Sequence, residues 1–339
     1  MSITKNQPLV SVVIPTHNSV KYICQAIESV LRQTYPHYEI IVVDDGSDDN
    51  TNKVLQLHTN PIQYFYQENQ GVSVARNQGL YHSQGEFIVF LDADDFMLPH
   101  KLEEQVRCFQ SYPHAGIIHS GWHLVNQYGE KFANIEPWQK IPQLNLETWL
   151  RWKPVIPGPM MFRREWLNCV GGFDPALKYA EDKDLIFRLA LAGCETVWLP
   201  QPTICYRQHS SSKKKNNILE VFKTQKYVLE NFLAKPDIPE NIRKIEDEIR
   251  YYTLLWIAWS AYNYGHFTEM KAYLQESLNY TSDVGIKVIV NWIENFQKFS
   301  SAKGEILDTY SITSSLEWKQ AIRQALKLNF LSSLTDKTR

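Results

Sequence analysis

Short apolar runs alternate with amphipathic segments through the first hundred residues of the chain. Four runs rich in β-branched and aromatic residues predict buried strands: 10–14, 38–43, 62–66 and 87–91. Apolar residues recur at helical spacing between Tyr22 and Leu31, and a second helix is predicted between the third and fourth runs. Strands and helices that alternate at this rhythm predict a parallel sheet whose two faces are covered by helices.

Polar and acidic residues follow three of these strands at their carboxyl ends. The first strand leads into 15–18 (Pro-Thr-His-Asn), the second into 44–49 (Asp-Asp-Gly-Ser-Asp-Asp), and the fourth into 92–95 (Asp-Ala-Asp-Asp). Ligands of open α/β sheets bind in the crevice outside the carboxyl ends of the strands. We therefore expect these three segments to converge on one site.

The crowded carboxylates after the fourth strand indicate a particular chemistry. Neighbouring carboxylates repel one another, so a cation or a set of hydrogen-bond donors has to compensate them. Oxygen ligands alone suit Mg²⁺ or Mn²⁺, which often takes substrate phosphates as further ligands. Acidic residues also form ordinary turns between strands and helices, so this motif alone leaves both interpretations open.

Length and composition limit the class of protein. The 339 residues leave room for two domains, and 44% hydrophobic with 21% charged residues is ordinary for a globular protein. The formal net charge of −2 gives no indication of nucleic acid binding. Five cysteines without a Cys-x-x-Cys pattern favour a reducing compartment. No signal peptide is recognisable, and the apolar stretch 251–262 is too short and too polar to span a bilayer, so we expect a cytoplasmic protein.

The order of motifs resembles the family 2 glycosyltransferases of the GT-A fold. The resemblance runs over roughly residues 9–212 and rests on seven segments: 15–18 (PTHN), 43–47 (VDDGS), 69–79 (NQGVSVARNQG), 91–95 (LDADD), 170–174 (VGGFD), 181–185 (EDKDL) and 206–209 (YRQH). The pattern of 161–164 (MFRR) also fits an acceptor-side segment of the family. One departure is His17, where the family commonly carries a tyrosine; both rings are planar and can stack on a base.

The resemblance implies a domain organisation. Residues 1–215 would form a GT-A catalytic domain with a Rossmann-like mixed sheet, in which about 1–97 hold the donor and about 98–215 the acceptor. Residues 216–339 would form a helical C-terminal extension. Within it, aromatic residues on either side of Gly265 predict a helix, a tight turn and a second helix. These helices could support a homo-oligomer or a peripheral contact with the inner face of the membrane.

The resemblance also implies the activity and the donor site. A hexosyltransferase of polysaccharide biosynthesis would use a nucleoside-diphosphate sugar, expected to be a UDP-sugar, and a glycan or lipid-linked acceptor. The implied residues for the nucleotide-sugar are Pro15, Thr16, His17, Asn18, Asp45, Arg76, Asp92 and Ala93. The carboxylate of Asp45 can accept the ring N–H of uracil, but guanine offers a similar donor, so this residue alone leaves the base open.

A divalent metal, Mn²⁺ or Mg²⁺, is expected at the diphosphate. By resemblance Asp94 is the direct ligand, with His209 as a further ligand and Asp92 as the second choice, while Asp95 supports the site. The metal would neutralise the charge that develops on the leaving diphosphate. Lysines that follow His209 could hold phosphates, although such a charge run is usually a solvated loop.

The acceptor hydroxyl requires a base, and Glu181-Asp182 is the candidate pair. An apolar stripe at helical spacing follows it, so the pair is expected in the first turn of a helix, where acidic residues are also favoured without any catalytic role. The resemblance implies that Asp182 is the base and that Glu181 orients it or binds the acceptor. One base without a second nucleophilic carboxylate implies direct displacement with inversion.

Several alternatives stay open at this point. A nucleotidyltransferase also combines an α/β sheet with acidic metal ligands, but usually carries a basic, glycine-rich loop after the first strand; a relative that only binds nucleotide or glycan is a second alternative. The tryptophans Trp122, Trp138, Trp149 and Trp152 could form a platform for a sugar acceptor, although Trp149 could instead belong to the core face of a short helix. His119 and His123 have the spacing of a zinc site only on a helix, and their segment is predicted to be a strand.

Overall fold

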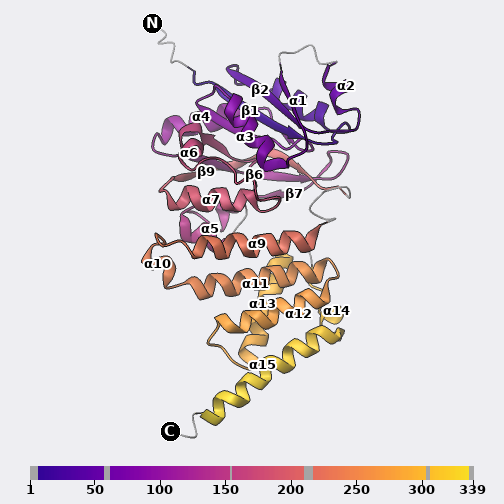
Figure 1. The fold of residues 1–339 in the computed structure, drawn as a ribbon, viewed down its shortest axis with the longest axis vertical. Helices are drawn as coiled ribbons and strands as arrows, with labels where there is room; N and C mark the ends of the chain where they lie inside the picture. The colour runs from indigo at the N-terminus through magenta and orange to yellow at the C-terminus, as the bar shows by residue number, and fades with distance from the viewer. Residues whose placement is uncertain (1–6, 57–61, 153–154, 210–216, 303–305, 336–339) are drawn as a thin grey trace. The chain divides into compact units, whose positions relative to one another are not determined.

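The computed structural model describes residues 7–56, 62–152, 155–209, 217–302 and 306–335. The side chains of 152, 302 and 328–335 are not described. The chain divides into two compact units, Met1–Asn216 and Asn217–Arg339. The first contains the sheet and the second consists of helices (Figure 1).

The first unit is built on a mixed sheet with the strand order β3-β2-β1-β4-β8-β6-β9-β5, and β7 pairs with β6. The strands are β1 (Val10–Thr16), β2 (Tyr38–Asp45), β3 (Gln63–Gln67), β4 (Phe87–Phe90), β5 (Phe96–Met97), β6 (Ile117–Val125), β7 (Lys131–Ile135), β8 (Met161–Arg163) and β9 (Thr196–Arg207). The first four strands along the chain are parallel neighbours, and β8 joins them antiparallel to β4. The four predicted strands are therefore confirmed, and the second half of the unit makes the sheet mixed.

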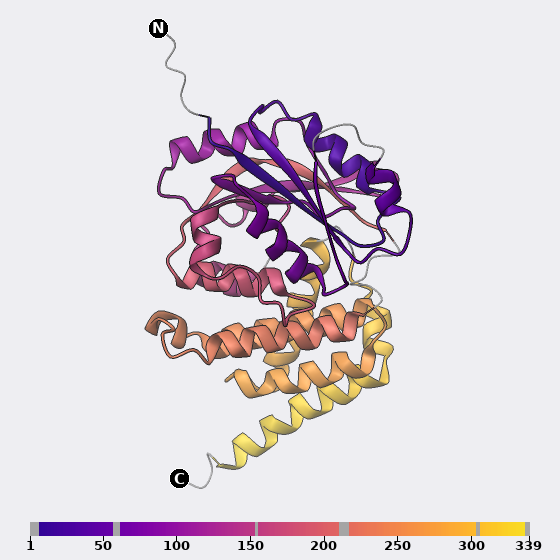
Figure 2. The ribbon, with the colours of Figure 1, turned by 45° about the horizontal axis from the view of Figure 1, so that its top comes forward.

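Helices cover both faces of this sheet (Figure 2). Those of the first unit are α1 (Ile23–Leu31), α2 (Thr51–Gln56), α3 (Val72–His82), α4 (Lys101–Ser111), α5 (Leu146–Trp152), α6 (Arg164–Cys169) and α7 (Glu181–Leu191), with a 3₁₀ turn at Pro137–Gln139. Alternate residues of β1 face opposite sides: Val12 packs in one core with the apolar stripe of α1, whereas Val13 lies against α3. There, a Cβ on Gly79 would come within 2.1 Å of Val13, so the glycine allows α3 to approach β1 closely. Each fully buried Val or Ile of these faces stabilises the fold by about 1.5–3 kcal/mol.

The second half of the first unit has an aromatic core around His119. The imidazole is fully buried and stacks on Trp198 with ring centroids 4.6 Å apart, and Trp149 lies 5.9 Å away. Trp122 and Trp149 are 5% and 1% exposed, so neither offers a face to a sugar, and the alternative of a core position is confirmed for Trp149. Trp138 is half-buried, and the side chain of Trp152 lies outside the described residues. His119 and His123 both lie on the strand β6, as predicted.

The second unit consists of helices around a core of its own. They are α9 (Ile218–Leu233), α10 (Glu240–Arg243), α11 (Glu246–Asn263), α12 (Phe267–Ser277), α13 (Ile286–Ala302), α14 (Thr309–Ser314) and α15 (Leu316–Thr335), with a 3₁₀ turn at Leu278–Tyr280. Gly265 has a φ of +78° and joins α11 to α12, which confirms the predicted helix, glycine turn and helix. Trp259, Trp292 and Trp318 are buried in this core. Within the described residues, no helix is long and apolar enough to cross a membrane.

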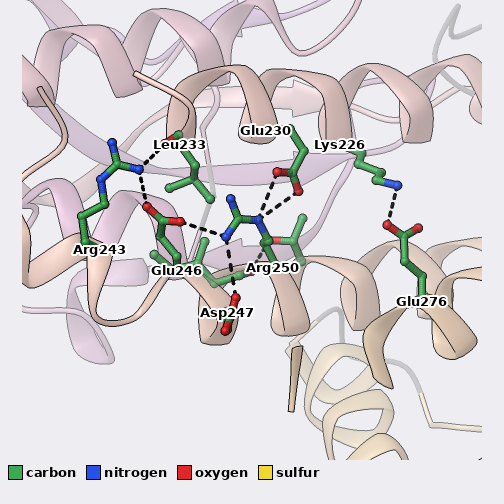
Figure 3. Close-up of polar contacts among 10 residues, drawn as sticks. Lys226, Glu230, Leu233, Arg243, Glu246, Asp247, Arg250 and Glu276 are labelled. Carbon is green, nitrogen blue, oxygen red and sulfur yellow. Dashed lines mark hydrogen bonds and ion pairs between the residues drawn. The ribbon is translucent and has the colours of Figure 1, made fainter. Parts of the chain in front are cut away.

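Ion pairs connect the helices of the second unit (Figure 3). Arg250 on α11 lies 3.0 Å from a carboxylate oxygen of Glu230 on α9 and 3.0 Å from Glu246 on its own helix. Glu246 also accepts from Arg243 at 2.6 Å. Pairs of this kind at partly exposed positions each contribute about 0.2–1 kcal/mol, so they align α9 with α11 while the apolar core supplies most of the stability.

Candidate functional site

The three polar segments predicted to converge do lie at one edge of the sheet. β1 lies between β2 and β4, and all three strands run in the same direction. Their carboxyl ends therefore bring together Thr16, Asp44 and the segment 92–95 that follows β4. The chain leaves β1 toward β2 on one side and reaches β4 on the other, so this edge is the topological switch point of the parallel part of the sheet.

The segment after β1 is held by hydrogen bonds to the turn after β2. Asn18 adopts the left-handed conformation (φ 53°), and its side-chain oxygen accepts from the backbone N–H of Asp48 at 2.9 Å. Its own N–H donates to Ser47 at 2.9 Å. Asn18 thus fixes two loops against each other. Pro15 and Thr16 are buried in β1, and the hydroxyl of Thr16 has no hydrogen-bond partner among the described residues, which leaves it available to a ligand.

His17 has a fixed orientation at this edge. Its Nδ1 lies 2.7 Å from the backbone oxygen of Asp45. Because a carbonyl oxygen can only accept, Nδ1 carries the proton and Nε2 is the acceptor. The side-chain nitrogen of Asn69 lies 3.0 Å from Nδ1 and 3.3 Å from Nε2. The contact with the backbone oxygen of Asp45 thus fixes the orientation of the imidazole, and Asn69 packs against the ring.

The carboxylate of Asp45 is held by the loop that precedes α3. Its Oδ1 accepts from the side-chain amide of Gln67 at 2.8 Å and from the backbone N–H of Gln70 at 2.8 Å. Its Oδ2 accepts from the N–H of Gly71 at 2.9 Å. Gly46, directly after Asp45, has a φ of +73°, and a Cβ there would lie 2.7 Å from the backbone nitrogen of Asn69, so only glycine lets the two loops meet. Asp44, by contrast, accepts from Ser47 and Tyr64 and shapes the turn.

Arg76 connects two segments that lie far apart in the sequence. One terminal nitrogen donates to Asp92 and the other to Glu181, both at 2.7 Å. Arg76 is 3% exposed, and its guanidinium lies 5.2 Å from the ring centroid of Phe173. Burial lowers the pKa of Arg76, but the charges of Asp92 and Glu181 outweigh it and raise the pKa above its ordinary value. Contact of Arg76 with the nucleotide stays a prediction, whereas its link between the segment after β4 and the start of α7 is observed.

The two candidates for the catalytic base, Glu181 and Asp182, lie in the first turn of α7, as predicted. Glu181 and Asp182 are 4% and 7% exposed. The preceding residue, Ala180, is in the left-handed conformation with φ 57°, which is uncommon for a residue with a Cβ. One oxygen of Asp182 accepts from the N–H of Lys183 at 2.8 Å. Arg76 thus restrains Glu181, whereas Lys183 occupies one oxygen of Asp182.

The candidate metal ligands Asp94 and His209 face each other. His209 Nε2 lies 2.9 Å from Asp94 Oδ2, and the carboxylate side chain of Asp94 is 37% exposed. One carboxylate and one imidazole are a donor set that Mn²⁺ or Mg²⁺ accepts when phosphates and water supply the other ligands. Within the described ranges, no cluster of three or more His, Cys, Asp or Glu side chains that could hold a metal occurs. Asp92, the second candidate for a metal ligand, accepts a hydrogen bond from Arg76 through one oxygen, and the next residue, Ala93, is buried.

Arg207, which belongs to the motif 206–209, contacts the acidic segment after β4. Its backbone N–H donates to Asp95 Oδ1 at 2.8 Å, and its Nε donates to the backbone oxygen of Asp94 at 2.7 Å. The guanidinium also lies 4.7 Å from the ring centroid of Tyr22. Asp95 is buried, and burial together with the charges of Asp94 and Asp92 raises the pKa of its carboxyl group well above the ordinary value. Arg207 and Asp95 therefore support the loop that presents Asp94.

Known proteins include several that are similar to this chain in sequence. Residues 11–171 match the model of Glycosyl transferase family 2. The chain is 36% identical over 215 residues to an uncharacterised glycosyltransferase of Nostoc sp., covering 60% of this chain and 66% of the relative. It is 38% identical over 130 residues to TuaG of Bacillus subtilis, named for teichuronic acid biosynthesis, covering 37% and 51% of the two chains. Across such relatives the chain spans from 27% to 66% of their length.

Solved structures show the same fold. Residues 1–349 of TarS from S. aureus, in complex with UDP-GlcNAc, have a TM-score of 0.64 at 18% identity, covering 95% of this chain and 92% of that chain. The mannosyltransferase PcManGT from Pyrobaculum calidifontis, in complex with GDP-Man and Mn²⁺, has a TM-score of 0.59 at 18% identity, covering 96% and 88%. These likenesses confirm the GT-A fold class with a helical C-terminal region. By sequence, the match to the family model and to the relatives places residues 11–171 of the chain in glycosyl transferase family 2.

Proposed function

We propose that this chain transfers a sugar from a nucleoside-diphosphate sugar to a hydroxyl group of a glycan or lipid-linked acceptor, with inversion at the anomeric carbon. The observation that carries the proposal is the bridge from Asp92 through Arg76 to Glu181. This bridge couples the loop expected to hold the donor to the helix turn expected to hold the base. A site that only binds nucleotide has no need for such a link to a second carboxylate pair.

The donor half of the site supports binding of the nucleotide and its diphosphate. His17 is oriented to stack on the base, and Asp45 is oriented to accept from its ring N–H. Asp92 would bind the ribose, since one of its oxygens is held by Arg76 and the side chain is 36% exposed. Asp94 and His209 would hold the divalent metal, which supplies Lewis-acid stabilisation of the leaving diphosphate when bound.

The acceptor half provides the proton acceptor. A sugar hydroxyl attacks only as its proton is removed, and a positioned carboxylate contributes about 10²–10⁴-fold. Arg76 donates to Glu181, and this ion pair ties the Glu181 carboxylate to the bridge. Asp182 accepts from the N–H of Lys183 through one oxygen and can direct the other at the acceptor, so we assign it the role of base. With one such base, displacement occurs in a single step and the configuration inverts.

The test is release of nucleoside diphosphate from a panel of nucleotide-sugars. The full chain is incubated with each donor and Mn²⁺, without acceptor, and slow hydrolysis is followed by liquid chromatography. We expect hydrolysis of at least one donor, lost in excess chelator and in Asp94→Ala. A panel that shows neither hydrolysis nor binding of any nucleoside diphosphate would contradict the proposed function. Hydrolysis that persists in excess chelator would contradict the metal assignment alone.

A further inference from the structure

Asn77 on α3 is bonded twice to the backbone of one residue in the segment that precedes α7. Its side-chain nitrogen donates to the carbonyl oxygen of Phe173 at 2.7 Å. Its side-chain oxygen accepts from the N–H of Phe173 at 2.9 Å. Because the amide pairs with both polar backbone groups of one residue, it fixes the position and the orientation of that backbone. The two residues are 96 positions apart in the sequence, so the contact ties two distant segments together.

Two glycines allow the turn 170–174 to reach Asn77. Gly171 and Gly172 have φ values of +77° and +72°, in the region that favours glycine. A Cβ on Gly172 would lie 2.5 Å from the side-chain oxygen of Asn77. The close approach of this turn to α3 therefore depends on the absence of a side chain at Gly172.

The same segment is also held at other points by α3 and α7. Arg188 on α7 donates to the backbone oxygens of Val170 and Gly172, both at 2.7 Å. The hydroxyl of Ser73 on α3 donates to the backbone oxygen of Leu177 at 2.8 Å. The segment 170–177 is thus the spacer that sets where α7 begins relative to α3.

We propose that Asn77 is a positioning residue for the catalytic base, acting through the turn 170–174 on the start of α7 and so on Asp182. This inference rests on the proposed function. The helix α3 begins directly after the loop whose N–H groups hold Asp45, so the same helix contacts the donor half and the segment that leads to the base. Asn77 itself contacts the backbone of Phe173 and lies outside the proposed donor contacts.

Loss of the amide would release the turn from α3. The ring of Phe173 would still lie against the guanidinium of Arg76, which is 5.2 Å from the ring centroid, so the core contact would stay while the backbone position is no longer fixed. A displacement of about 1 Å at a reacting group can lower a rate by about 10²-fold. The expected result is therefore a base that is present but poorly placed.

The experiment measures turnover with water as the acceptor. The full chain is incubated in Mn²⁺ buffer with UDP-glucose, UDP-GlcNAc and GDP-mannose, each radiolabelled in the sugar, and the free sugar is counted. Water also has to lose a proton as it attacks, so this reaction depends on the base. We expect Asn77→Ala to lower kcat by about 10–10²-fold, with the KM of the donor and the Kd of UDP within about twofold of the wild type.

A double-mutant cycle separates positioning from a loss of structure. Asp182→Asn has no base to misplace, so the addition of Asn77→Ala should lower its residual rate by less than about threefold. A general loss of folded protein would lower both rates by the same factor. The melting temperature of each variant is measured as well, and turnover is assayed well below it.

Two further variants sharpen the test. Asn77→Asp keeps the size of the side chain and the acceptor for the N–H of Phe173, but sets a second acceptor against its carbonyl oxygen, so kcat should fall here too. Gln78→Ala is the matched control, because Gln78 is the next residue on α3 and its side chain is exposed. Its kcat should equal that of the wild type.

Each contradicting outcome concerns a separate point. A kcat of Asn77→Ala equal to that of the wild type, or an equal loss with and without Asp182, would overturn the positioning role and leave the proposed function intact. Hydrolysis that is unchanged in Asp182→Asn would overturn the assignment of the base, and the inference with it. A wild type that hydrolyses none of the three donors and binds neither UDP nor GDP would overturn the proposed function itself.

Discussion

Removal of the Arg76 guanidinium should destabilise the first unit strongly. In Arg76→Met, Glu181 keeps its place at the start of α7 but loses its cation, and the side chain of Glu181 is only 6% exposed. Removing one partner of a buried ion pair costs about 3–5 kcal/mol. Asp92 contributes little to this sum because its side chain is 36% exposed and water can solvate it. For a domain of this size, we expect the melting temperature of the unit to fall by about 6–20 °C.

Scanning calorimetry of the full chain with a double-mutant cycle measures this effect. Glu181→Gln removes the buried charge, so the double variant Arg76→Met/Glu181→Gln should recover about 1–3 kcal/mol relative to the sum of the two single variants. Arg32→Met is the matched control: Arg32 also pairs with a glutamate, Glu28, at 2.8 Å, but the two side chains are 75% and 49% exposed. Its effect should stay within about 0.5 kcal/mol.

The reasoning fails if Arg76→Met unfolds within about 1 kcal/mol of the wild type. It also fails if Glu181→Gln gives no recovery in the double variant, because the cost would then come from packing against Phe173 and not from the charge. A destabilised variant that still binds UDP as the wild type does would show that the bridge is not needed to orient Asp92.

Three further predictions follow from the metal ligands, the buried lysine and the second unit. Asp94→Ala should abolish turnover and weaken binding of UDP in Mn²⁺ buffer, measured by calorimetry, while the melting temperature without nucleotide stays within about 2 °C, because the side chain is partly exposed. Burial lowers the pKa of Lys101 well below 10.5, so the unfolded chain binds more protons than the folded chain and the free energy of unfolding rises with pH toward 10.5. Thermal unfolding between pH 7 and 10 measures this rise, which should be smaller in Lys101→Met. A chain that ends near residue 215 should still bind UDP but lose solubility or change its mass by light scattering, and a soluble truncation that binds no nucleotide would contradict this.

Local patterns were sufficient to predict the first half of the fold. Runs such as Val10–Ile14 and Phe87–Leu91 are rich in β-branched and aromatic residues because the strands are buried on both faces, which is a strong local signal. The rule that ligands bind at the carboxyl ends of parallel strands then placed the segments 15–18, 44–49 and 92–95 at one edge before any coordinates.

Contacts between distant residues could not be predicted in the same way. Arg76 and Glu181 are 105 positions apart, and their bond depends on how α3 and α7 are placed by the sheet. The pairing of Gln67 with Asp45 depends on the register of β2 and β3, and a shift of one residue would turn Gln67 to the other face. Trp149 illustrates a third limit, because a tryptophan near a predicted acceptor site has the same local pattern whether it binds a sugar or, as here, fills the core. The loop 69–71, which holds Asp45, does carry a local signal. Gly71 has a φ of +94°, a conformation that favours glycine, and its N–H donates to Asp45.

The most direct test of the account is the behaviour of Asp182→Asn. The substitution keeps the shape of the side chain at the start of α7 and removes its basicity. We expect nucleotide-sugar binding within about twofold of the wild type, and transfer to an added acceptor reduced by about 10²-fold or more. Transfer at the wild-type rate would contradict the assignment of Asp182 as the base.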